Sequence, residues 1–430
     1  MFDDQNFEPL LAKFREEFMR VKTLVLFVVT LAFAASAWAG TDTVLYNFCS
    51  QTSCVDGYVP YGSLVADTSG NHLYGTTYYG GTNNYGEVFE LTNSGGSWSQ
   101  TVIYSFLGPS NNDGAYPFGG LVFDAAGNLY GTTYQGGASS EGTVFELSKS
   151  GSTWKETVLH TFDDISGSDG YYPYGALAFD AAGNLYGTTL YGGKLSGGTV
   201  FELKASNGKY TYKVIHGFTT SSSSAYYPYG GVVVDSKNGY LYGTTYNGGV
   251  VWNAGAVYQL RQVSGVWIYT VIYNFLGDSL GQYTESGLAV DATGNLYGTN
   301  YQGGSFNLGS VFKLTPGANN TWTQKIIYSF KSYAKKDGAY PYFAGVTLDA
   351  LGNIYGTTYQ GGSSAANNLN YGTVYKLTAG TYKESVLWSF GTTGDGYYPY
   401  HQPILVNGKL YGTTNNGGLH GGGVVYEVAP

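Results

Sequence analysis

The sequence is poor in charged residues, has only two cysteines, and has no helical periodicity of useful length after residue 40. Charged side chains make up 11% of its 430 residues and aromatic side chains 17%, whereas disorder requires high charge and few aromatics. The net charge of −9 includes no basic stripe, which excludes nucleic acid as an expected partner. We find no nucleophile motif, no glycine-rich phosphate loop leading into a helix and no metal-ligand spacing, so neither a cofactor nor a metal is expected.

The two cysteines, Cys49 and Cys54, lie close together near the start of the repeated region. If the protein is exported, a local disulfide is expected between them because the external environment is oxidising. The alternative is two unpaired loop thiols. Two cysteines alone make a poor metal site.

Residues 1–39 do not share the pattern of the rest of the chain. Within them, 19–39 begin Met-Arg-Val-Lys, continue as a short apolar run, and end Ser-Ala-Trp-Ala, which predicts a secretory signal cleaved after Ala39. The alternative, a membrane anchor, fits less well because the run is short for a span. Residues 1–18 form an unusual charged leader, so Met19 is a candidate for the true start. We expect a secreted or periplasmic protein, free of the membrane after signal removal, whose folded part is 40–430.

One phrase, Leu-Tyr-Gly-Thr-Thr, recurs seven times with small changes. The steps between its tyrosines are 55 to 58 residues, which indicates one repeat architecture rather than several ordinary domains. These tyrosines are Tyr74, Tyr130, Tyr186, Tyr242, Tyr297, Tyr355 and Tyr411.

Each repeat contains four short runs rich in Val, Leu, Tyr, Phe and Thr, separated by Gly, Asn, Asp and Ser. This pattern predicts four strands, which we name A to D from the centre outward; the recurring phrase is strand B, expected to pack one blade against the next. Seven such units closing a ring predict an all-β, seven-bladed β-propeller. The first run, 43–48, is of D type and the last, 423–428, is of C type. The N-terminal strand is therefore expected to close the last blade and remove an open edge.

A second motif, Asp-x-x-Gly-Asn, joins strands A and B. It could be a calcium loop, but in the last repeat it shrinks to an Asn-Gly hairpin, which favours a plain turn in which the aspartate bonds backbone groups. The aspartates are Asp67, Asp124, Asp180, Asp291 and Asp349.

The repeat resembles the GloVer tandem repeat of secreted bacterial proteins. The matching motifs are the Asp-Gly-x-x-Pro loop, Gly-Asn-Leu-Tyr-Gly-Thr-Thr, a Gly-Gly loop and Gly-Thr-Val-Phe-Glu-Leu, in near-complete copies over residues 43–428. The resemblance implies an exported repeat protein, often with a C-terminal surface anchor, and no established activity. This chain stops right after its last strand, so a freely secreted or periplasmic protein is favoured over an anchored one.

Two loops of each repeat are expected on one face of the propeller. The loop from D to A, Asp-Gly-Tyr-x-Pro-Tyr-Gly, carries the aspartates Asp56, Asp113, Asp169, Asp337 and Asp395 and the tyrosines Tyr61, Tyr174, Tyr229, Tyr342 and Tyr400. The loop from B to C, Tyr-x-Gly-Gly, carries Tyr78, Tyr134, Tyr246, Tyr301 and Tyr359. Aromatic faces beside carboxylates and backbone amides suit sugar rings, so we take these residues as candidate ligand contacts. The alternatives are that the tyrosines only pack blades together and that the aspartates only cap turns.

Two repeats depart from the pattern. Repeat five has Gln-Tyr-Thr-Glu-Ser in place of Tyr-Tyr-Pro-Tyr-Gly, which introduces Glu285, and repeat seven has His401 where Gly175 stands. Glu285 and His401 are the only candidates for acid–base catalysis, and neutral drift is the alternative. His160 and His216 replace strand-D tyrosines and are interpreted as packing residues rather than metal ligands.

Three functions remain open. The first is a non-enzymatic, monomeric protein that binds an extracellular glycan or protein through the loop face. The second is a secreted carbohydrate hydrolase or lyase that uses loop carboxylates. The third is a surface or matrix scaffold. Near-identical aspartates in five repeats favour multivalent binding or turn capping over a unique catalytic pair.

Overall fold

A computed structural model describes residues 42–430 except 165–166, 222–223, 250–252, 332–335 and 363–370. The proposed signal and Met19 therefore lie outside the described residues. Residues 42–430 form one compact unit. Within the described part of this unit, no helix is long and apolar enough to cross a membrane.

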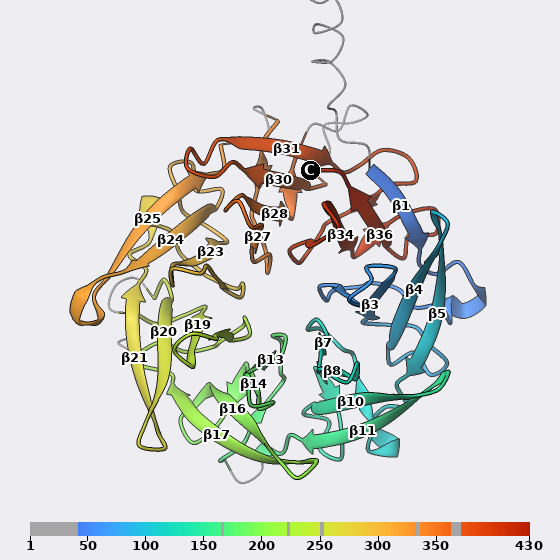
Figure 1. Cartoon of the computed structure of the whole chain (residues 1–430), viewed down its shortest axis with the longest axis horizontal. Helices are drawn as coiled ribbons and strands as arrows, with labels where there is room; N and C mark the ends of the chain where they lie inside the picture. The colour runs from blue at the N-terminus through green and yellow to red at the C-terminus, as the bar shows by residue number, and fades with distance from the viewer. Residues whose placement is uncertain (1–41, 165–166, 222–223, 250–252, 332–335, 363–370) are drawn as a thin grey trace, which may run out of the picture. The chain divides into compact units, whose positions relative to one another are not determined.

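The described strands form seven four-stranded antiparallel sheets arranged around a central axis, confirming the all-β, seven-bladed propeller (Figure 1). The inner A strands are β2 (Val65–Ala66), β7 (Val122–Phe123), β13 (Ala178–Phe179), β18 (Val233–Asp235), β22 (Ala289–Val290), β27 (Thr347–Leu348) and β33 (Ile404–Val406). The B strands, which contain the recurring phrase, are β3 (His72–Thr77), β8 (Leu129–Thr133), β14 (Leu185–Thr189), β19 (Tyr240–Thr245), β23 (Leu296–Asn300), β28 (Ile354–Thr358) and β34 (Lys409–Thr414).

The two outer strands of each blade are longer than the A strands. The C strands are β4 (Glu87–Ser94), β10 (Thr143–Ser150), β16 (Ser196–Ser206), β20 (Ala256–Val263), β24 (Ser310–Pro316), β30 (Thr373–Leu377) and β36 (Val424–Val428). The D strands are β5 (Ser97–Ser105), β11 (Thr153–Thr161), β17 (Lys209–Thr219), β21 (Val266–Asn274), β25 (Trp322–Ser329), β31 (Glu384–Ser389) and β1 (Asp42–Asn47). Short 3-10 turns lie in the loops: η2 (Thr52–Cys54), η3 (Pro109–Asn111), η5 (Asp278–Leu280) and η6 (Ala318–Asn320).

The two ends of the described chain meet in the last blade. Strand β1 pairs antiparallel with β36, with Asp42 opposite Val428 and Asn47 opposite Val424, and the two lie side by side in Figure 1. The predicted closure by the N-terminal strand is confirmed. It leaves β36 paired on both sides, by β34 and β1.

Each position of the recurring phrase has its own packing role. Leu73 is buried in its blade, while Tyr74 packs on Phe123 and Trp154 of the next blade, with ring centroids 5.3 and 6.0 Å away. Gly75 faces the ring of Phe89 on the adjacent strand, where an added Cβ would lie 2.6 Å from Cζ. The glycine therefore makes room for a ring of its own blade.

The fourth residue of the phrase ties one blade to the next. Thr188 donates its hydroxyl to the carbonyl oxygen of Gly230 at 3.1 Å, and Thr244 donates to that of Ser286 at 2.8 Å. Together with the tyrosine contacts, these bonds support the interpretation of strand B as the inter-blade packing strand.

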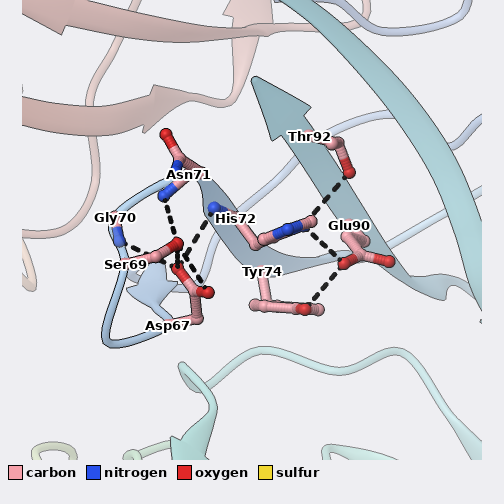
Figure 2. A network of polar contacts seen from close by, with 8 residues as sticks. All are labelled: Asp67, Ser69, Gly70, Asn71, His72, Tyr74, Glu90 and Thr92. Atoms are coloured by element: carbon pink, nitrogen blue, oxygen red, sulfur yellow. Dashed lines mark hydrogen bonds and ion pairs between the residues drawn. The ribbon is translucent and has the colours of Figure 1, made fainter. Parts of the chain in front are cut away.

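The Asp-x-x-Gly-Asn motif forms a hydrogen-bonded turn between strands A and B. In the second blade, Oδ1 of Asp124 accepts from the backbone N–H groups of Ala126 and Asn128 at 2.8 and 2.9 Å. The first blade has a Ser-Gly variant, in which Asp67 accepts from Ser69 and Gly70 (Figure 2). These carboxylates cap their own turns, as the turn interpretation predicted.

Candidate functional site

The two predicted loops lie against each other on one face. Short antiparallel ribbons join them in four repeats: β6 (Gly114–Ala115) with β9 (Gln135–Gly136), β12 (Gly170–Tyr171) with β15 (Tyr191–Gly192), β26 (Gly338–Ala339) with β29 (Gln360–Gly361), and β32 (Gly396–Tyr397) with β35 (Asn416–Gly417). Isolated bridges do the same in the others: Tyr58 with Tyr79, Tyr226 with Asn247, and Gln282 with Gln302. The expectation that the D–A and B–C loops share a face is confirmed.

One residue of each D–A loop adopts a left-handed backbone and joins neighbouring blades. In the third repeat this is Tyr172, with φ of 57°; its N–H donates to the carbonyl of Glu141 in the preceding blade at 2.9 Å, and its own carbonyl accepts from the N–H of Leu190 at 3.1 Å. The same two bonds recur at Val59, Tyr116, Tyr227, Tyr283, Tyr340 and Tyr398. A bulky residue in this conformation is strained, and the surrounding bonds hold it there.

The five loop aspartates are occupied by groups of their own loops and of the D strands. Asp113 accepts from the hydroxyl of Tyr104 at 2.8 Å and from the N–H groups of Leu107 and Gly114 at 2.7 and 2.6 Å. Asp56, Asp169, Asp337 and Asp395 make equivalent contacts with Tyr46, His160, Tyr328 and Trp388 of the D strands. The backbone contacts fit turn capping, the alternative interpretation, and the side-chain contacts tie the loop to strand D. A role of these aspartates in ligand binding stays a prediction.

The two strand-D histidines take the packing roles expected of them. Nε2 of His160 lies 2.9 Å from Oδ2 of Asp169. Burial alone would raise the pKa of Asp169, but hydrogen bonds from His160 and Tyr212 hold it below its usual range. His216 stacks on Tyr269 with ring centroids 3.8 Å apart. Among the described residues, no three His, Cys, Asp or Glu side chains are placed to share a metal ion.

The predicted disulfide is present between Cys49 and Cys54. It spans the loop in which the N–H groups of Ser50 and Gln51 donate to Asp56 at 2.8 and 3.1 Å. The disulfide therefore closes the capped loop that leads into the first blade.

The inner tyrosines of the D–A loops gather around the central axis. We call the seven residues at this repeat position the collar: Tyr61, Phe118, Tyr174, Tyr229, Glu285, Tyr342 and Tyr400. Phe118 lies 4.6 Å from Tyr61 and 4.3 Å from Tyr174 between ring centroids, and Tyr400 lies 4.8 Å from Tyr61. Glu285 therefore occupies the one collar position without an aromatic ring.

Phe343 fills the centre of the collar. It stands at the repeat position of Gly175 and contacts five collar rings, at centroid distances of 4.6 to 5.9 Å. At Gly175 itself, an added Cβ would lie 2.2 Å from the backbone of Gly231, so that blade has no room for a side chain there. Sequence reasoning singled out neither Phe118 nor Phe343, although Phe343 replaces the same glycine as His401.

Glu285 and His401 line one cavity of about 190 Å³, where the collar meets the inner strands β13 and β18. Glu285 is 5% exposed, and its Oε2 has no hydrogen-bond partner among the described residues; the same holds for Nδ1 of His401. Burial raises the pKa of Glu285 well above its ordinary value and lowers the pKa of His401 to about 4. The structure thus brings together the two acid–base candidates, while the five aspartates lie elsewhere.

The B–C loop tyrosines form partly exposed pairs with the left-handed tyrosines of the following loop. We call these the tyrosine pairs: Tyr78 with Tyr116, Tyr134 with Tyr172, Tyr246 with Tyr283, Tyr301 with Tyr340, and Tyr359 with Tyr398, with ring centroids 4.5 to 5.3 Å apart. The pairs repeat around the same face as the collar.

Comparisons with known proteins agree with this architecture. A family model described as the Gloeobacter/Verrucomicrobia repeat matches residues 30–251 and 290–430, which confirms the resemblance to the GloVer repeat. A xyloglucanase from a Paenibacillus species is 28% identical over 230 residues, covering 50% of this chain and 20% of that enzyme. The chain thus matches about a fifth of the length of this relative.

Solved structures with little sequence identity share the fold. A fungal alcohol oxidase, solved with copper, has a TM-score of 0.57 and 13% identity, covering 91% of this chain and 76% of its own. Oligogalacturonate lyase from Vibrio parahaemolyticus has a TM-score of 0.52 and 10% identity, covering 91% and 97%. At this identity the likeness concerns the propeller fold alone.

Proposed function

We propose that this chain, which belongs to the Gloeobacter/Verrucomicrobia repeat family, is an exported, non-enzymatic protein that binds an extracellular glycan on its tyrosine pairs. The observation that carries the proposal is the recurrence of partly exposed, closely packed tyrosine pairs around one face. Sugar rings pack their C–H faces on such aromatic surfaces, and the phenol hydroxyls add hydrogen bonds. Export rests on the signal pattern in residues 19–39.

Repetition of the pairs favours a polymer over a small sugar. A chain of sugar units can contact several pairs at once, so weak individual contacts add up through effective concentration. The relative named a xyloglucanase, of which the match covers 20%, supports a polysaccharide ligand.

Binding is tested on a glycan array and then by titration with the best oligosaccharide. The test variant is Tyr134→Leu with Tyr246→Leu, since Leu190 stands at the same position in the third repeat and shows that the loop accepts leucine. We expect these two changes to weaken binding of a long oligosaccharide by tenfold or more. Tyr240→Leu, at the opposite end of its blade, is the matched control and should bind as the unmodified protein does. Unchanged binding in the double variant would refute the role of the pairs.

A second candidate, a carbohydrate hydrolase or lyase, is favoured by the cavity that Glu285 and His401 share. A hydrolase normally requires two carboxyl groups across the scissile bond. Glu285 is the only carboxyl group among the described residues that line this cavity, which favours the binding function. Turnover of any polysaccharide that is lost in Glu285→Gln would reverse this preference.

A further inference from the structure

The cavity at the collar combines a carboxyl oxygen that has no hydrogen-bond partner among the described residues with aromatic walls. Oε2 of Glu285 is buried and unpaired among the described residues, and the rings of Tyr174, Tyr229 and Phe343 line the same space. We propose that this cavity binds a small organic ammonium ion, with Glu285 as its counter-ion and these three rings around its charge. This site goes beyond the glycan function and does not depend on it.

The position of Glu285 argues for a purpose beyond packing. In the other six repeats the collar residue is aromatic, and the neighbouring collar positions are Tyr229 and Tyr342. A buried carboxyl oxygen without a hydrogen-bond partner destabilises the fold, because its lost contacts with water are not replaced. A ligand that brings its own positive charge removes that cost.

The walls of the cavity suit a cation. Aromatic rings attract an ammonium group through their negative faces, and this attraction strengthens when water is excluded. Among the described residues that line the cavity there is no Lys or Arg. Burial lowers the pKa of His401 to about 4, so its ring is neutral near pH 7 and does not repel a cation.

The same walls fit other ligands less well. Calcium requires six to eight oxygen ligands, roughly, whereas the described lining supplies one carboxyl group. A cavity of about 190 Å³ lies below the range of about 300 to 1,000 Å³ typical of larger ligands. A small ion with one charged group therefore matches it best.

Binding must be coupled to proton release. Burial raises the pKa of Glu285 well above its ordinary value, so the carboxyl group holds its proton more tightly than a free one and gives it up when it pairs with a cation. The ionisable groups that face it are His401 and the phenols Tyr174, Tyr229, Tyr246, Tyr301, Tyr342 and Tyr400. Because binding releases the proton of Glu285, the affinity for the cation should rise as the pH rises towards the pKa of this carboxyl group.

Isothermal titration of the purified protein with choline tests the site. The neutral carbon analogue 3,3-dimethylbutan-1-ol has the same shape without the charge. We expect choline to bind, the analogue to bind at least tenfold more weakly, and the heat of choline binding to change between buffers of different ionisation enthalpy as a proton is released.

Two variants and a control complete the test. Glu285→Gln should abolish choline binding and its proton release while keeping the thermal midpoint. Phe343→Gly, which places at this repeat position the glycine that the third repeat has at Gly175, should weaken choline binding. Glu427→Gln, at the exposed pair with Lys409, should bind as the unmodified protein does. Equal binding of choline and its analogue, unchanged binding in Glu285→Gln, binding of calcium in place of choline, or no binding at millimolar choline would each overturn the proposal.

Discussion

At the scale of single residues, one position of strand C holds phenylalanine in some blades and tyrosine in others, although only phenylalanine leaves no polar group without a hydrogen bond there. The C-strand ring that packs on the strand-B glycine is Phe89, Phe145, Phe201 or Phe312 in four blades and Tyr258, Tyr375 or Tyr426 in three. The hydroxyl groups of these three tyrosines are buried without a hydrogen-bond partner among the described residues. This position accepts either ring, but the tyrosine hydroxyl loses its hydrogen bonds to water and gains none in the protein.

Tyr426→Phe should therefore stabilise the protein. Removal of a buried, unpaired hydroxyl group is expected to raise the free energy of unfolding by about 1 kcal/mol. The thermal midpoint measures this change. Tyr74→Phe is the control: its hydroxyl donates to Glu90 at 2.7 Å (Figure 2), so its removal should lower the midpoint. A lower midpoint for Tyr426→Phe would contradict the unpaired hydroxyl.

Substitution of a loop aspartate should instead destabilise the protein. Asp113 is 5% exposed and accepts three hydrogen bonds from its own loop and strand. Asp113→Ala should lower the free energy of unfolding by about 3 kcal/mol, because it leaves buried donors unpaired. Asp113→Asn keeps one acceptor oxygen, so its free energy of unfolding should lie between those of the unmodified protein and of Asp113→Ala. Glycan binding per folded molecule should not change in either variant. Loss of binding with an unchanged thermal midpoint would instead assign Asp113 to the ligand site.

At the scale of elements, the sequence predicted the strands and their order, because both depend on patterns along the chain. Strand B and its partners follow from alternation and period, and the packing role of strand B between blades follows from its place in the repeat. The left-handed backbone of Tyr172 could not be predicted, because tyrosine is a poor candidate for that conformation. Its cause is tertiary: bonds to Glu141 and Leu190 from two blades hold the residue in place.

Strand β1 is the element on which closure depends. A protein that begins at residue 40 should fold, whereas one that begins at residue 49 loses β1 and the fully buried Phe48 and leaves β36 as an open edge. We expect the shorter chain to unfold at a clearly lower temperature and to self-associate, as measured by thermal unfolding and light scattering. Equal midpoints for the two chains would show that closure by β1 contributes little.

At the scale of the whole molecule, the ring separates residues that the sequence places together. Asp169 and Tyr174 lie in one D–A loop, yet the aspartate contacts strand D at the outside while the tyrosine joins the collar at the axis. The spacing of residues along a repeat does not tell how far each side chain lies from the axis of the propeller. For the same reason Phe343 was missed: its importance comes from the rings of four other repeats, which converge on it together with the adjacent Tyr342.

Buried acids also act on the whole molecule. Burial, together with Asp56 nearby, raises the pKa of Glu87 to about 9, and the same causes raise Glu156 and Glu384, beside Asp113 and Asp337, to a pKa of about 7. An acid with a raised pKa holds its proton more tightly when folded. Its contribution to stability is therefore fully present below about pH 4.5, the pKa of an ordinary glutamate, and is lost as the pH rises through the pKa of the group in the folded protein.

The thermal midpoint should consequently be highest near pH 5 and fall towards pH 9. The two histidines with lowered pKa values of about 4, His216 and His401, act in the opposite sense and offset part of the fall below pH 6.5, where their unfolded forms titrate. Glu156→Gln with Glu384→Gln should flatten the fall between pH 5 and 8, because glutamine has no proton to lose. A midpoint that rises from pH 5 to 8 in the unmodified protein would mean that these carboxyl groups ionise as freely in the fold as in water.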